Sequence, residues 1–132
     1  MSKERLGKFE KWIVTHSYLK AKGELPANWK VPRGYADTYE PRDVLWKPEI
    51  LLNYFGHLRL SKRTPGKTIL EKFEDTKAYR NALTMFNRAV KRLERKKFIQ
   101  VWIEKRKRTL AAVSLEKEGM TKAENILSAS GQ

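Results

Sequence analysis

Cysteine is missing from this 132-residue sequence, and its absence excludes disulfide bonds, thiolate zinc sites and catalysis by a thiol. Histidine is almost as scarce. His16 and His57 lie far apart and lack the HExxH spacing of a zinc site. We therefore expect no metal and no other cofactor.

Long apolar runs are missing as well. No stretch approaches the ~18 apolar residues that a membrane-spanning helix needs. The first residues, MSKERLGKFEKWIV, lack the uninterrupted apolar segment of a secretory signal. These absences predict a cytoplasmic protein without a membrane partner.

A set of catalytic residues is not evident either. The carboxylates lie among basic residues, and no nucleophile is paired with a base in a pattern typical of an enzyme. The run TPGKT at residues 64–68 ends like a phosphate-binding loop, but Ser61 stands where that motif requires glycine. We therefore expect the protein not to be an enzyme.

Acidic residues are outnumbered by basic ones, 15 against 29, which gives a net charge of +14. This excess of positive charge is unevenly distributed along the sequence. Residues 57–108 hold 17 basic and 5 acidic side chains, a net of +12, whereas the rest of the chain holds 12 and 10, a net of +2. A compact chain with this charge repels itself, and a polyanion relieves the repulsion. The local excess predicts a surface for nucleic acid, ahead of an anionic membrane surface.

The first 47 residues are predicted to form a helix followed by an ordered wrap. Apolar residues spaced by three and four predict a helix over residues 3–22, ended by Gly23. This helix could pack on the rest of the protein or form a homodimer. Prolines interrupt residues 23–47, yet this segment is rich in aromatic side chains. We expect these to pack in the core rather than to stack on bases.

Residues 48–128 are predicted to form a domain of helices and one hairpin, followed by a polar tail at 129–132. Pro48 suits the first turn of a helix in PEILLNYFGHL. A short second helix is expected over residues 68–73, and a longer third helix from residue 76 or 80 to residue 97. The apolar stripe of the third helix comprises Leu83, Phe86, Val90 and Leu93.

After the third helix the apolar residues alternate with polar ones. Ile99, Val101 and Ile103 alternate with Gln100, Trp102 and Glu104, and Ile99 and Val101 are expected to be buried. A second alternating run ends at Leu115. The polar run KRKR separates the two, so this segment is predicted to be a β-hairpin. A last helix is expected over residues 116–127.

Three helices followed by a hairpin are typical of a winged helix-turn-helix domain, and residues 86–119 resemble the recognition helix and wing of the MarR-like regulators. The matching residues are Phe86, Arg88, Val90, Arg92, Leu93, Glu94, Phe98 and Ile99 in the helix, Lys105, Arg106, Lys107 and Arg108 in the tip, and Val113, Ser114, Leu115, Glu118 and Gly119 after it. Lys97 departs from the family, which usually has glycine there, and the family's long C-terminal dimerisation helix has no counterpart. The resemblance implies a mainly α fold with a small β-hairpin: a winged helix-turn-helix with an extra N-terminal helix and an aromatic, proline-rich wrap.

The outward side of the third helix carries the candidate DNA-binding residues. Positions three and four apart share a face, so the side opposite the apolar stripe presents Arg80, Thr84, Asn87, Arg88, Lys91 and Arg95. Arginine pairs with guanine and asparagine with adenine, so the first four are expected to contact bases in the major groove. Lys91 and Arg95 are better placed for phosphates. The tip residues Lys105, Arg106, Lys107 and Arg108 are expected at the backbone or in the minor groove.

These expectations combine into a nucleoid-associated, sequence-specific regulator of transcription that binds duplex DNA. One alternative is a structural RNA-binding protein of a ribonucleoprotein particle such as a ribosome, which would bind folded or single-stranded RNA. Another is a winged helix whose basic face meets an acidic protein.

Overall fold

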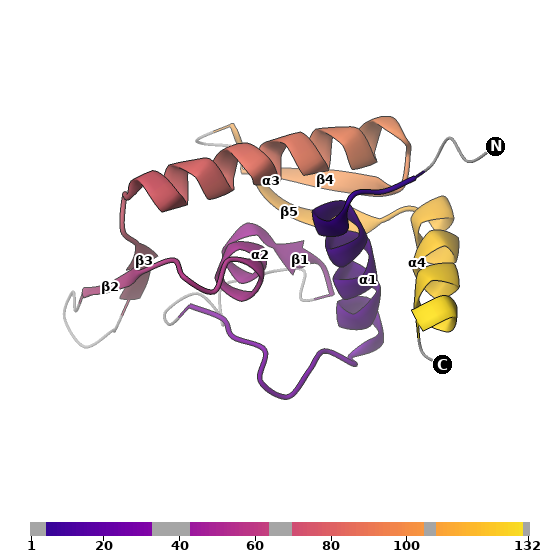
Figure 1. The fold of residues 1–132 in the computed structure, drawn as a ribbon, viewed down its shortest axis with the longest axis horizontal. Coiled ribbons are helices and arrows are strands. Elements are labelled where there is room, and N and C mark those ends of the chain that lie inside the picture. Colours follow the sequence, from indigo (N-terminus) through magenta and orange to yellow (C-terminus); the bar gives the residue numbers. More distant parts are fainter. Residues whose placement is uncertain (1–4, 33–42, 64–69, 105–107, 131–132) are drawn as a thin grey trace.

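The computed structural model describes residues 5–32, 43–63, 70–104 and 108–130. Their elements are, in order, α1 (Lys8–Lys22), β1 (Leu45–Trp46), α2 (Lys47–Tyr54), β2 (Leu60–Arg63), β3 (Leu70–Phe73), α3 (Lys77–Arg95), β4 (Ile99–Glu104), β5 (Thr109–Leu115) and α4 (Lys117–Ser130). The fold is mainly α with small antiparallel sheets, which confirms the predicted class. In Figure 1, α3 runs along one edge of the protein with β4 beside it, and α1 and α4 lie side by side.

Helix α1 begins at Lys8, later than predicted, because Gly7 has an extended backbone (φ −70°, ψ 170°) and takes the cap position. The Gly7 N–H donates to Glu10 Oε1 at 3.3 Å. The predicted end is confirmed, since Gly23 adopts the left-handed conformation (φ 72°) that glycine tolerates best. Residues 1–4 lie outside the described ranges.

The apolar side of α1 is part of the core. Ile13 and Val14 are fully buried, and α1 contacts α4, α3 and the sheet. Of its two predicted roles, packing within the chain is therefore confirmed. A homodimer through this helix would need its remaining exposed side and stays a prediction.

The predicted hairpin forms as β4 and β5, and β1 pairs with β5 to give a three-stranded sheet in the order β1-β5-β4. Leu45, Val113 and Val101 form one row across it and face the core. The burial predicted for Ile99 is confirmed and Val101 is half-buried, whereas Ile103 is 52% exposed. A register shift lies between Trp102 and Ile103, where Ala111 of β5 is the extra residue.

The short helix predicted over residues 68–73 is also wrong. Residues 70–73 form β3, which pairs antiparallel with β2, with Leu60 opposite Phe73 and Arg63 opposite Leu70. So short a segment gains little from helical hydrogen bonds, because helix nucleation is costly, whereas pairing with β2 satisfies its backbone at once. Residues 64–69 lie outside the described ranges. This hairpin separates α2 from α3 and lies beyond the N-terminal end of α3 (Figure 1).

One hydrophobic core includes residues from both the first 47 residues and the rest of the chain. It includes Ile13 and Leu45 from the first 47 residues, and Ile50, Phe86 and Ala123 from the remainder. Within the described part of the chain, no helix has both the length and the apolar character that crossing a bilayer requires.

The aromatic wrap is fixed to the core through a buried carboxylate. Glu49 is 1% exposed and accepts hydrogen bonds from Trp29 Nε1 (2.9 Å), the Trp46 backbone N–H (2.9 Å) and Lys20 Nζ. Trp29 also stacks on Trp12, with ring centroids 5.6 Å apart. The predicted packing of the wrap aromatics is therefore confirmed for Trp29, whereas Tyr35 and Tyr39 lie outside the described residues.

Candidate nucleic-acid interface

Helix α3 carries the candidate interface, and both of its ends are well defined. At the start, Thr76 Oγ1 accepts a hydrogen bond from the Tyr79 N–H at 3.1 Å. At the end, the Phe98 N–H donates to the Leu93 carbonyl (3.1 Å) and the Lys97 N–H to the Glu94 carbonyl (2.9 Å). This is the paired arrangement that usually requires glycine. Lys97 adopts the required left-handed conformation, with φ 63°.

The inward side of α3 is apolar and fixes the rotation of the helix. Its buried residues are Ala82, Phe86, Ala89, Val90 and Leu93. Leu83, predicted inward, is half-buried at the border of this stripe. Because the apolar side is held in the core, the opposite side must face solvent.

That opposite side forms a basic stripe. We define the basic stripe as Lys77, Arg80, Thr84, Arg88, Lys91 and Arg95, all exposed and spaced by three or four residues. At ~1.5 Å per residue the stripe extends over roughly 27 Å. Asn87 is exposed at its edge. The exposure predicted for all six helix residues, from Arg80 to Arg95, is therefore confirmed.

The members of the stripe differ in their local partners. Arg80 NH1 lies 2.9 Å from Asp75 Oδ1, and both side chains are exposed. Thr84 Oγ1 donates to the Arg80 carbonyl at 3.1 Å, so only its lone pairs remain for a ligand. In the described ranges, Arg88, Lys91 and Arg95 have no carboxylate within ion-pair distance. Three neighbouring cations thus face solvent without an ion-pair partner among the described residues.

Contacts with the N-terminal part of the chain hold the C-terminal half of α3. Arg92 NH1 lies 3.3 Å from Oε2 of the buried Glu10, and Lys96 Nζ donates to the Arg5 carbonyl at 3.3 Å. These two cations, Arg92 on α3 and Lys96 at its C-terminal cap, are therefore directed toward the N-terminal part of the chain. They position the helix, whereas the basic stripe remains available.

The hairpin that follows α3 contributes one described residue of the predicted tip. Arg108 is exposed, has a left-handed backbone (φ 54°), and its N–H donates to the Glu104 carbonyl at 2.8 Å. Lys105, Arg106 and Lys107 lie outside the described residues.

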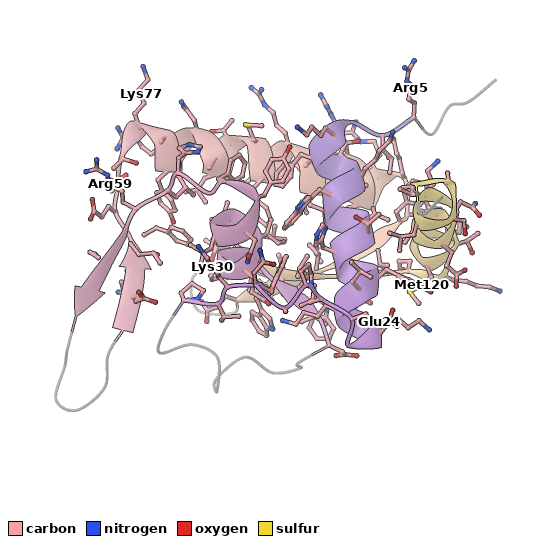
Figure 2. The ribbon with its side chains drawn as sticks, turned by 60° about the horizontal axis from the view of Figure 1, so that its bottom comes forward. Arg5, Glu24, Lys30, Arg59, Lys77 and Met120 are labelled. Carbon is pink, nitrogen blue, oxygen red and sulfur yellow. The ribbon has the colours of Figure 1, made fainter. Side chains whose placement is uncertain are left out.

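Lys77 is a member of the stripe that sequence reasoning missed. It is the first residue of α3 and points away from the protein, and Arg59 lies at the same end (Figure 2). Its position three residues before Arg80 was the available signal. The ring of Phe73 stacks on Tyr79 at 5.4 Å, which attaches the β2–β3 hairpin to this end of α3. Burial raises the pKa of Tyr79, and the charge of Asp75 adds to the shift.

The structure offers no second kind of site in the described residues. There, no three His, Asp or Glu side chains converge as a metal site requires. His16 is stacked on Trp12 and Trp29, and its Nδ1–H donates to the Trp12 carbonyl at 2.8 Å. Burial lowers the pKa of His16, and the hydrogen bond to Trp12 opposes part of that shift. These contacts give His16 a packing role.

Comparison of the chain with protein-family models, with curated proteins and with solved structures finds no match. The resemblance to the MarR-like regulators therefore rests on the residues quoted above, and the interface rests on the geometry of α3.

Proposed function

We propose that this protein binds duplex DNA with the basic stripe of α3 in the major groove and acts as a sequence-specific regulator of transcription. One observation carries the proposal: Arg88, Lys91 and Arg95 face solvent on one side of a helix without a carboxylate partner among the described residues. Unpaired cations in a row lower the cost of holding a polyanion and release its counterions. A helix ~10–12 Å wide also fits the major groove, which is ~12 Å wide.

Within this proposal the residues of α3 have two tasks. Asn87 and Arg88 carry the amide and guanidinium groups that pair with adenine and guanine edges. Lys91 and Arg95 bind phosphates and set the position of the helix on the duplex. Arg108, with the tip residues Lys105, Arg106 and Lys107, contacts the backbone or the minor groove.

The order of the elements around α3 supports this arrangement. The hairpin β4–β5 follows α3 directly, β4 lies beside α3, and β1 completes a small sheet with β5. Helix α2 precedes α3 as the first helix of a helix-turn-helix would, but the β2–β3 hairpin replaces the usual short turn between them. The proposed domain is therefore a winged helix with an inserted hairpin.

A titration against three labelled probes tests the proposal: random duplex DNA, single-stranded DNA and a structured RNA. The proposal expects the duplex to bind tightest. Tightest binding to RNA would favour the ribonucleoprotein alternative instead, and no binding to any probe would favour an acidic protein partner. Selection from a random duplex pool then tests sequence preference, and a pool without enrichment would contradict the regulatory role.

A further inference from the structure

Two consecutive apolar side chains are exposed on β4. Trp102 is 38% exposed and Ile103 is 52% exposed. A register shift lies between these two residues, and its extra residue is Ala111 on the neighbouring strand β5. Bulges of this kind redirect side chains and are common next to binding sites.

Trp102 belongs to the outer face of the three-stranded sheet. The row Leu45, Val113 and Val101 faces the core, so the adjacent row must face the other way. This outer row consists of Trp46 on β1, Ala112 on β5 and Trp102 on β4. The small Ala112 is fully buried although it lies outside the hydrophobic core cluster. Of this row, Trp102 is the member whose side chain is exposed.

The Trp102 indole is held in place. Its Nε1–H donates to Ser114 Oγ on the neighbouring strand at 3.0 Å. A ring fixed by a hydrogen bond loses less conformational entropy when a ligand packs on it. Gln100, two residues earlier on the same face, is exposed and offers amide donors and acceptors beside the ring.

The charge around this surface favours an anionic partner. Among the described residues, the exposed Arg108 directly precedes β5. Strand β4 also lies beside α3, the helix that carries the basic stripe (Figure 1). A patch of one indole and one isoleucine in this setting suits a nucleobase attached to a phosphate backbone. A large apolar protein interface would exclude such charge from its centre.

We infer that Trp102 stacks on an unpaired nucleobase that flanks the duplex bound by α3, with Gln100 beside the base. The protein then prefers a duplex that carries a single-stranded extension over a blunt duplex. This inference rests on the proposed function, since α3 must first hold the duplex.

The test compares a labelled 20-base-pair blunt duplex with the same duplex carrying a four-nucleotide single-stranded extension at either end. Wild-type protein should bind an extended duplex roughly 5- to 100-fold tighter than the blunt one, the range of one stacked base. Trp102→Ala should remove this preference and leave blunt-duplex affinity within about twofold. Trp102→Phe, which keeps an aromatic ring, should retain most of it. Ser114→Ala, which frees an intact indole, should give an intermediate loss.

Ile103→Ala is the matched control, because it removes an exposed apolar side chain without an aromatic ring and should change the preference little. The inference is overturned if wild-type protein binds blunt and extended duplexes equally, or if Trp102→Ala weakens both alike. It is also overturned if Trp102→Ala turns a dimer into a monomer in sedimentation velocity, which would identify a contact between copies. Failure to bind any probe would overturn the proposed function as well.

Discussion

Arg80 and Asp75 form an ion pair at the N-terminal end of α3, with NH1 2.9 Å from Oδ1 and both side chains exposed. The carboxylate lies beside the basic stripe and would repel a phosphate held there. Asp75→Asn should therefore raise affinity for duplex DNA several-fold at low salt. Titrations at two salt concentrations measure the effect, which should shrink as salt rises.

Glu24→Gln provides the matched control. Glu24 is exposed at the far end of α1 (Figure 2), so its replacement gives the same change of net charge away from α3. An equal gain from both variants would show that net charge alone acts, and would contradict a binding surface on this helix.

The left-handed backbone of Lys97 gives a prediction about stability. A non-glycine residue in this conformation costs about 1–2 kcal/mol, part of which glycine recovers. Lys97→Gly should raise the free energy of unfolding by about 0.5–1 kcal/mol, measured by urea denaturation. Lys97→Ala removes the same charge but keeps the strained backbone. If alanine stabilised the protein as much as glycine, charge rather than backbone conformation would be the cause.

The ion pair of Lys20 with the buried Glu49 supports the wrap, α1 and α2 together. Lys20→Met leaves a buried carboxylate without its cation and should lower the free energy of unfolding by about 3 kcal/mol. The double variant Lys20→Met/Glu49→Gln removes both charges and should be more stable than Lys20→Met alone. A loss below about 0.5 kcal/mol for Lys20→Met would show that the pair contributes little, as exposed pairs do.

His16 predicts a dependence of stability on pH. Burial lowers its pKa in the folded protein relative to the unfolded chain, so the unfolded chain binds the proton first. Stability from this residue is therefore complete above the unfolded pKa of about 6.5 and falls as the pH drops below it. His16→Gln should flatten the curve of unfolding free energy below about pH 7. An identical curve for the variant would assign the dependence to other groups.

The periodic parts of the sequence predicted the fold well, and the short or irregular parts did not. The apolar stripe from Phe86 to Leu93 correctly predicted which side of α3 faces the core, because the spacing of apolar residues decides which side of a helix is buried. Strand β1 was missed, since its two residues gain their structure from pairing with β5. The β2–β3 hairpin was missed for the same reason, because cross-strand pairing outweighed local preference.

Side-chain partners were harder to predict than exposure. From the sequence, Arg80 and Arg88 were both expected to contact bases. In the structure, Arg80 pairs with Asp75, whereas Arg88 has no carboxylate partner among the described residues. The register shift between β4 and β5 was not predicted either, because it depends on how the two strands meet.

Salt dependence of binding to duplex DNA tests the central claim most directly. Lys91 and Arg95 should each neutralise one phosphate, so replacing both with alanine should lower the slope of log affinity against log salt concentration by about 1.8 units. A control that replaces Lys22 and Lys30 removes the same charge outside α3 and should leave the slope nearly unchanged. A smaller slope for the α3 variant alone is the predicted result, and equal slopes for the two variants would contradict the account.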